Sequence, residues 1–239
     1  MGIGHSLVIV SLVIGHSYMG IGHSHGQVTH ASQTLSFGVV ILAAGASSRM
    51  GQPKLLLPWG NTSILGHLIA QWRRIGAEQI AVVTSASAEG IDQELRQLGF
   101  PEEDCIRNPA PELGMFTSIQ CAARWSDWKS NLTHCVIALG DQPHLRRETL
   151  SALLSLGAAH REAVCQLTRQ GRRRHPVLLP QDAFRQLAHS RHHNLKEFLQ
   201  SLSSEVALQE SEDAGLDLDL DQPADYEKAV QLYGARVVR

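Results

Sequence analysis

Short apolar runs alternate with amphipathic stretches along most of the chain. The runs at 38–43 and 134–139 are rich in β-branched and other apolar residues, and a Gly-containing loop follows each of them, which predicts two buried strands. Further strands are expected at 79–84, 105–107, 163–168 and, in a shorter form, 176–179. Apolar runs of this kind are typical of strands that are covered on both faces.

Apolar residues at helical spacing lie between these runs. The segment 63–75 has Thr62 or Ser63 as its N-cap and Gly76 as its stop, so a helix is expected there. The other expected helices cover 88–98, 115–125, 146–156, 182–188, 195–202 and 224–233. Alternating strands and helices predict a Rossmann-like α/β fold, with one mostly parallel sheet flanked by helices on both faces. Ligands bind beyond the carboxyl ends of such strands, so the loops after Ala43 and Leu139 are the places to search.

Composition divides the chain into two unlike parts. The 239 residues carry 21 Lys and Arg against 23 Asp and Glu, a net charge of −2 that does not favour nucleic-acid binding. Arg49 is the first charged residue, whereas five of the 13 histidines precede it. We therefore interpret 1–37 as a low-complexity arm and 38–239 as a single domain.

The arm repeats a short Gly-His-Ser motif, as MGIGHS at 1–6 and MGIGHSH at 19–25. It is either a His-rich metal-binding arm or a disordered or mis-assigned start, and we favour the second interpretation. Its apolar run at 7–14 has eight residues, whereas a helix needs about 20 to cross a bilayer. No Lys or Arg precedes that run, and the four cysteines form no CxxC pair, so we expect a cytoplasmic protein with reduced thiols.

The loop after the first strand reads LAAGASSRMGQPK over 42–54. Small residues let backbone N–H groups approach an anion closely, and Arg49 and Lys54 add positive charge. The loop is neither a Walker-type loop nor GxGxxG. It is a candidate triphosphate cradle.

A Gly/Ser-rich loop alone is weak evidence of function, but the order Gly, Arg, Gly and Lys after a strand is a much more specific signal. The segment 42–60 closely resembles the opening signature of the molybdenum-cofactor nucleotidyltransferases, the MobA-like NTP transferases. Four more segments resemble that family in the same order, namely NPAPELGMFTS at 108–118, LGDQP at 139–143, RHPV at 174–177 and DLDQPAD at 219–225. The resemblance covers about 38–233.

The resemblance implies a nucleotide-diphospho-sugar transferase-like fold and a Mg²⁺-dependent nucleotidyltransferase that releases pyrophosphate. It makes Arg49, Lys54 and Asp141 catalytic, and it assigns Mg²⁺ to Asp141 and Asp221, with Asp219 in reserve. The residues that it places around the nucleotide are Leu42, Ala43, Ala44, Gly45, Gly51, Lys54, Gly114, Met115, Ser118 and His175. No general base is needed, because a phosphate acceptor is already ionised near neutral pH.

LAAG at 42–45 resembles the cytidylyl-transferring branch, so CTP and a molybdopterin-type acceptor are expected. The alternatives are another base, a sugar or alcohol phosphate, or a non-catalytic nucleotide- or metal-binding protein. His192 and His193 stand where relatives carry a Gly-Asp-x-Gly-x-Arg stretch, and Arg174 stands where they often have Gly. The run 172–174 is either a solvated loop or a contact for an anionic acceptor. From the residues alone, Asp141 could instead cap the next helix, and 217–221 could be an edge strand.

Overall fold

The computed structural model describes residues 35–45, 50 and 53–234. This part of the chain belongs to one compact unit. The predicted arm lies almost wholly outside the described residues, so its boundary stays a prediction. Among the described residues, no helix combines the length and the apolar character needed to cross a membrane.

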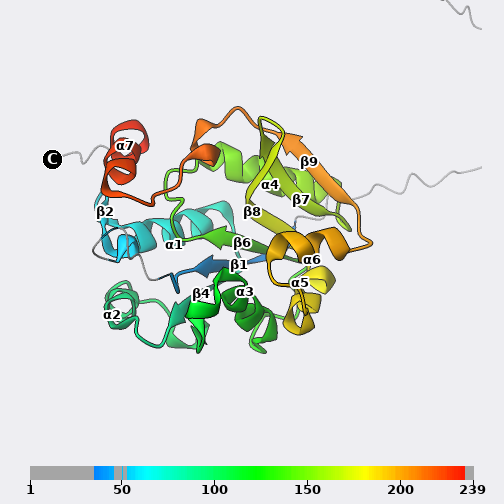
Figure 1. Ribbon diagram of the computed structural model, residues 1–239, viewed down its shortest axis with the longest axis horizontal. Coiled ribbons are helices and arrows are strands. Elements are labelled where there is room, and N and C mark those ends of the chain that lie inside the picture. Colours follow the sequence, from blue (N-terminus) through cyan, green and yellow to red (C-terminus); the bar gives the residue numbers. More distant parts are fainter. Residues whose placement is uncertain (1–34, 46–49, 51–52, 235–239) are drawn as a thin grey trace, which may run out of the picture. The chain divides into compact units, whose positions relative to one another are not determined.

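The described residues form a seven-stranded sheet (Figure 1). From one edge to the other its strands are β5 (Cys105–Asn108), β4 (Gln79–Ser85), β1 (Phe37–Leu42), β6 (His134–Leu139), β8 (Arg172–Pro180), β7 (Val164–Arg169) and β9 (Val206–Glu210). Only β8 runs against its two neighbours, and the other pairs in this sheet are parallel. The predicted mostly parallel sheet is therefore confirmed.

Helices cover both faces of the sheet. They are α1 (Ile64–Ile75), α2 (Glu89–Gln97), α3 (Met115–Arg124), α4 (Arg147–Ala159), α5 (Gln181–Gln186), α6 (Leu195–Ser201) and α7 (Pro223–Tyr233). Figure 1 shows α1 and α4 on one side of the sheet and α3 and α5 on the other. Val39 and Ile41 pack in one hydrophobic cluster and Val40 in the other, and all three are fully buried. This two-sided burial explains why the strands read as continuous apolar runs.

The start of α1 illustrates how local sequence sets an element. The Ser63 hydroxyl accepts a hydrogen bond from the Gly66 backbone N–H at 3.0 Å, which satisfies one of the unpaired donors of the first turn. The helix ends at Gly76, whose φ of 101° is a left-handed conformation that a residue without Cβ adopts at low cost. Ser63, rather than Thr62, is thus the N-cap.

The structure departs from the sequence predictions in the second half of the sheet. Strand β8 begins at Arg172 rather than 176, because it forms a hairpin with β7 across Gln170 and Gly171, both at positive φ. Strand β9 is absent from the sequence predictions, because only Ala207 of its five residues is buried and the strand shows neither a long apolar run nor an alternation.

The segment 217–221 is not an edge strand, so that alternative is wrong. A 3₁₀ turn (Ala214–Asp217) leads into irregular backbone, in which Leu220 is fully buried while Asp219 and Asp221 are exposed.

Candidate active site

Two loops meet at the carboxyl ends of β1 and β6. These strands are parallel neighbours, and their last residues, Leu42 and Leu139, are paired across the sheet. The loop after β1 and the turn after β6 therefore lie side by side. A Cβ on Gly140 would come within 2.6 Å of the Leu42 carbonyl oxygen, so the close approach of the two backbones requires glycine there.

A cavity of about 300 Å³ opens at this edge of the sheet. Its lining consists of Leu42, Ala43, Ala44, Gly45, Lys54, Leu55, Pro111, Gly114, Met115, Ser118, Leu139, Gly140 and Asp141. Most of the residues predicted to surround a nucleotide are thus brought together, although they come from loops that are distant in the chain. The predicted Arg49 and Gly51 lie outside the described residues. Sequence reasoning missed Leu55 and Pro111, which lie beside motif residues but carry no chemical signal of their own.

Lys54 joins the first loop to both predicted metal ligands. Its Nζ donates a hydrogen bond to Oδ2 of Asp141 at 2.7 Å and lies 3.6 Å from Oδ1 of Asp221. The side chains of Lys54 and Asp141 are only 18% and 20% exposed, so water and salt weaken the attraction in this ion pair less than they weaken it in a surface pair. The structure therefore places a cation between two carboxylates that come from distant parts of the chain.

The acidic side of this arrangement fits a divalent cation. Oδ1 of Asp141 is buried and has no hydrogen-bond partner among the described residues, so its lone pairs are not used by a protein donor there. Mg²⁺ prefers oxygen ligands and is usually held by one or two carboxylates together with phosphate oxygens and water. Among the described residues there is no group of three or more His, Cys, Asp or Glu side chains that could hold a metal ion.

The alternative role for Asp141, as a helix cap, is wrong. The next helix, α4, begins at Arg147 and has Arg146 as its N-cap. Asp141 instead lies in the turn after β6, where its side chain contacts Lys54.

Asp219 belongs to the same group of charges. Partial loss of hydration raises the pKa of its carboxyl, and the negative charges of Asp141 and Asp221 raise it further. Arg174 and Lys54 oppose this rise. The reserve candidate is therefore close enough to sense both predicted metal ligands.

The N-terminus of α3 is held by a buried residue that sequence reasoning missed. Asn108, 1% exposed at the end of β5, donates hydrogen bonds to the hydroxyls of Thr117 and Ser118, each at 2.9 Å. Its Oδ1 accepts a bond from the Ala110 N–H at 2.9 Å. These bonds hold the first turn of α3, and with it Ser118, in place beside the cavity. A polar residue at the end of a predicted strand was the signal that could have found Asn108.

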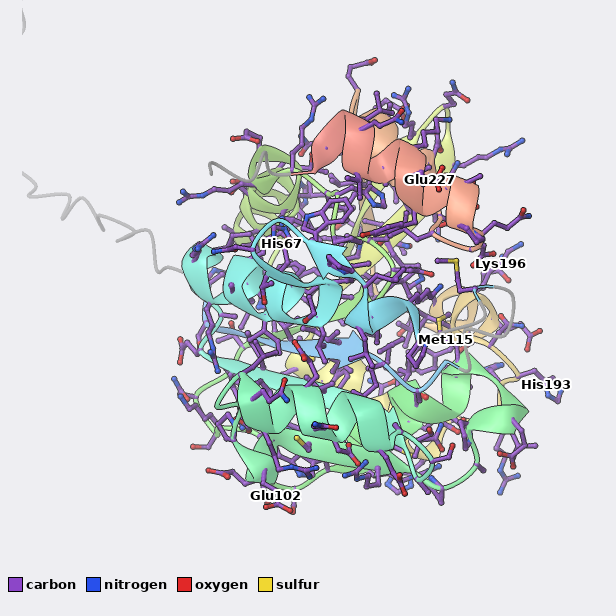
Figure 2. The ribbon with its side chains drawn as sticks, turned by 90° about the vertical axis from the view of Figure 1, so that its left-hand side faces the viewer. His67, Glu102, Met115, His193, Lys196 and Glu227 are labelled. Atoms are coloured by element: carbon purple, nitrogen blue, oxygen red, sulfur yellow. The ribbon has the colours of Figure 1, made fainter. Side chains whose placement is uncertain are left out.

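A second cavity, of about 780 Å³, shares Met115 with the first. It is lined by Met115, Gln166, Arg172, Arg173, His175, Asn194, Leu195, Lys196, Leu199 and Gln200. Met115 is 47% exposed, and Figure 2 shows it together with Lys196. Three cationic side chains therefore face a space adjoining the candidate nucleotide cavity.

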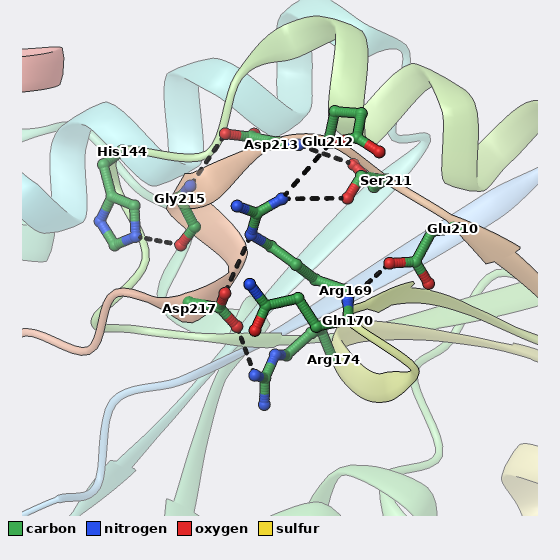
Figure 3. Close-up of polar contacts among 10 residues, drawn as sticks. All are labelled: His144, Arg169, Gln170, Arg174, Glu210, Ser211, Glu212, Asp213, Gly215 and Asp217. Atoms are coloured by element: carbon green, nitrogen blue, oxygen red, sulfur yellow. Dashed lines mark hydrogen bonds and ion pairs between the residues drawn. The ribbon is translucent and has the colours of Figure 1, made fainter.

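Two predictions need qualification here. His175 lines the second cavity rather than the first, and burial lowers its pKa, against a smaller opposing effect of Asp141, so its imidazole is neutral near neutral pH. Of the arginine run, Arg172 and Arg173 face the second cavity, whereas Arg174 donates to Asp217 instead (Figure 3). The run is strand rather than solvated loop.

Comparison with known proteins agrees with this geometry. The sequence model of the MobA-like NTP transferase domain matches residues 39–206, which include both strands that end at the cavity. The chain belongs to this family. It is accordingly a nucleotidyltransferase, and its sheet has the nucleotide-diphospho-sugar transferase fold.

Individual relatives extend the comparison over most of the chain. The molybdenum cofactor cytidylyltransferase of Escherichia coli K12 is 27% identical over 195 residues, which are 81% of this chain and 95% of that enzyme. A solved structure of Rv0371c from Mycobacterium tuberculosis H37Rv has a TM-score of 0.67 at 24% identity and covers 83% of this chain and 99% of that one. A structure of the same mycobacterial protein in complex with manganese has a TM-score of 0.64 at 24% identity, with coverages of 82% and 99%. At such identities the structural likeness shows the fold.

Proposed function

We propose that this nucleotidyltransferase moves CMP from CTP to the phosphate of a molybdopterin-type cofactor, with Mg²⁺ as its metal and pyrophosphate as the second product. The observation that carries the proposal is that Lys54 and Asp141 meet in the lining of the cavity beside the family's opening signature, with Asp221 3.6 Å from Nζ of Lys54. The 27% identity to the cytidylyltransferase of E. coli over 95% of that enzyme supports the choice of acceptor and base, as does LAAG at 42–45.

The nucleotide would occupy the smaller cavity. Ala43, Ala44 and Gly45 present short side chains there, which lets their backbone N–H groups approach phosphate oxygens. The first turn of α3 also faces this space, and the unpaired N–H groups of a helix N-terminus favour an anion. Lys54 supplies the formal positive charge that a departing pyrophosphate needs.

Asp141 and Asp221 are the residues that would hold the metal. A bound Mg²⁺ supplies neutralisation of phosphate charge, which lowers the barrier to in-line phosphoryl chemistry. The two carboxylates come from a tight turn after β6 and from irregular backbone before α7, so their separation depends on the tertiary structure. The manganese complex of the mycobacterial protein supports a divalent metal in this family.

The acceptor would occupy the larger cavity, next to Met115. Arg172, Arg173 and Lys196 line it, and Arg suits phosphate because its planar guanidinium donates two parallel hydrogen bonds. The acceptor phosphate attacks the α-phosphorus and pyrophosphate leaves, so one P–O bond forms as another breaks. The attacking oxygen is already ionised, and the neutral His175 therefore has no proton to remove.

One assay tests the proposal. The purified protein is incubated with each of the four NTPs in turn, Mg²⁺ and molybdopterin cofactor, and pyrophosphate release is followed. We expect release with CTP that depends on the cofactor. Release with another base, or with a sugar or alcohol phosphate in place of the cofactor, would redirect the proposal to a related transferase. No release with any combination would overturn it in favour of a non-catalytic binding protein.

A further inference from the structure

One carboxylate joins two strands of the sheet to the segment that precedes Asp221. Asp217 accepts a hydrogen bond from Nε of Arg169 at 2.9 Å on one oxygen and one from Nη2 of Arg174 on the other (Figure 3). Arg169 ends β7 and Arg174 lies in β8, so the two guanidinium groups come from the two strands of one hairpin. Their side chains are only 18% and 26% exposed. The contact is therefore a charge-assisted bridge in which the two arginine side chains are largely covered while Asp217 stays exposed.

The segment that follows Asp217 has little structure of its own. Residues 218–221 form neither helix nor strand, and Asp221 lies four residues beyond Asp217. The fully buried Leu220 fixes the middle of the segment, and its carbonyl oxygen lies 3.4 Å from Nζ of Lys54. At the far end, Tyr226 of α7 donates from its hydroxyl to the Pro58 carbonyl oxygen at 2.6 Å. The position of Asp221 thus depends on side-chain anchors on either side of it.

A second anchor, Asp213, holds the start of the 3₁₀ turn that ends at Asp217. Asp213, whose side chain is 4% exposed, accepts bonds from the Thr149 hydroxyl at 2.5 Å and the Gly215 N–H at 2.9 Å. His144 contacts the Gly215 carbonyl oxygen through Nε2 at 2.9 Å. The 3₁₀ turn at 214–217 is therefore rigidly attached to the domain, and Asp217 is its last residue, with Leu220 as the next anchor before the predicted metal ligand.

We propose that Asp217, held by Arg169 and Arg174, is a positioning residue that sets the place of Asp221 in the divalent-metal site. This inference rests on the proposed function, because it takes Asp221 as a metal ligand. Residues that orient metal ligands from outside the coordination shell typically change metal affinity by 10- to 100-fold when they are replaced. Arg174 thus serves the metal side of the site, although its neighbours Arg172 and Arg173 face the other cavity.

Because Arg174 and Asp217 carry opposite charges, the direction of the change in Mn²⁺ affinity distinguishes a positioning role from a purely electrostatic one. Replacing Arg174 by Gln removes a positive charge near the carboxylates, and replacing Asp217 by Asn removes a negative one. If the two groups acted only through their charge, Arg174→Gln would strengthen Mn²⁺ binding and Asp217→Asn would weaken it. If they position Asp221, both substitutions weaken binding. We expect the dissociation constant for Mn²⁺ to rise about tenfold in both variants.

The measurement is Mn²⁺ binding to the full-length protein, followed by the electron paramagnetic resonance signal of free Mn²⁺. Asp182 and Arg185, an exposed pair on α5 at 3.7 Å, provide the matched controls Asp182→Asn and Arg185→Gln, which should bind Mn²⁺ as the wild type does. Thermal unfolding of each variant shows whether it is folded. If Asp217→Asn does not fold, Arg174→Gln still carries the test, because the bond from Arg169 to Asp217 remains.

The outcomes separate the two proposals. Binding by Asp141→Asn that equals wild-type binding overturns the metal site and, with it, this inference. Loss of binding in Asp141→Asn together with unchanged binding, or with shifts of opposite sign, in the Arg174 and Asp217 variants overturns only the positioning role. Weaker binding in both variants, with full activity recovered at saturating Mg²⁺, supports it.

Discussion

Nζ of Lys54 lies 2.7 Å from Oδ2 of Asp141, although 87 residues separate the two in the chain. The contact exists because β1 and β6 are adjacent parallel strands that end together. Each residue follows one of these strands, so the fold delivers a cation and a carboxylate to one edge of the sheet. Their partial burial strengthens the pair, since less water screens it.

Lys54→Met should lower the rate of pyrophosphate release about 100- to 1,000-fold, the loss typical when one stabilising donor is removed from a site of developing charge. The measurement is the turnover number with saturating nucleotide and Mg²⁺. Lys129→Met is the matched control, because the Lys129 ammonium donates only to the Glu78 carbonyl oxygen in an exposed contact. A Lys54→Met enzyme that kept more than about a tenth of wild-type turnover would remove this lysine from the mechanism.

Substitutions in the second cavity should affect the acceptor alone. Arg173→Gln and Lys196→Gln each remove a cation from its lining, and a hydrogen bond to a charged group contributes about 1.5–3 kcal/mol, so the KM for the acceptor should rise about tenfold or more. The KM for CTP should stay unchanged. Arg191→Gln, which removes an exposed arginine outside this lining, is the control. A rise in the KM for CTP, with none for the acceptor, would exchange the roles of the two cavities.

Asn108→Ala should destabilise the fold and loosen the nucleotide cavity. The substitution removes the partner of the buried Ser118 hydroxyl, which costs about 1–3 kcal/mol, whereas the Thr117 hydroxyl keeps its bonds to the carbonyl oxygens of Ala110 and Gly114. Urea unfolding measures the loss, and the KM for CTP should rise as well. Asn131→Ala is the control, because the Asn131 amide donates to the Glu78 carboxylate in an exposed contact. Equal stability of the two variants would show that Asn108 does not organise α3.

The stability of the protein should fall as the pH drops from 7 toward 5.5. Burial is the first cause that lowers the pKa of His67, His134, His144 and His175 in the folded protein. The unfolded chain, with an ordinary histidine pKa of about 6.5, therefore binds more protons below that pH, and protonation favours unfolding. Urea unfolding at several pH values tests this expectation.

The histidine prediction has its own control. His144→Gln should make the free energy of unfolding depend less steeply on pH, whereas His193→Gln, at an exposed position, should not change the slope. A stability that rises on acidification over this range would contradict the effect of burial.

Much of the fold follows from local sequence. The apolar runs at 38–43 and 134–139, the cap at Ser63 and the stop at Gly76 each act within a few residues, so the elements that they predict agree with the structure. The hairpin of β7 and β8 could not be predicted in the same way. Its β8 strand begins with charged residues, and pairing across the sheet decides whether such residues are strand or loop.

The candidate site also has features that follow from local sequence and features that depend on contacts between distant segments. The residue types show which groups are present, namely a small-residue loop with Lys54, an acidic turn at Asp141 and a carboxylate at Asp221, because such side chains carry their chemistry wherever they lie. That Lys54 lies between the two carboxylates, that Arg174 donates to Asp217 and that two cavities share Met115 is visible in the folded chain alone. These relations depend on strand order and on contacts between distant segments, which no local pattern encodes.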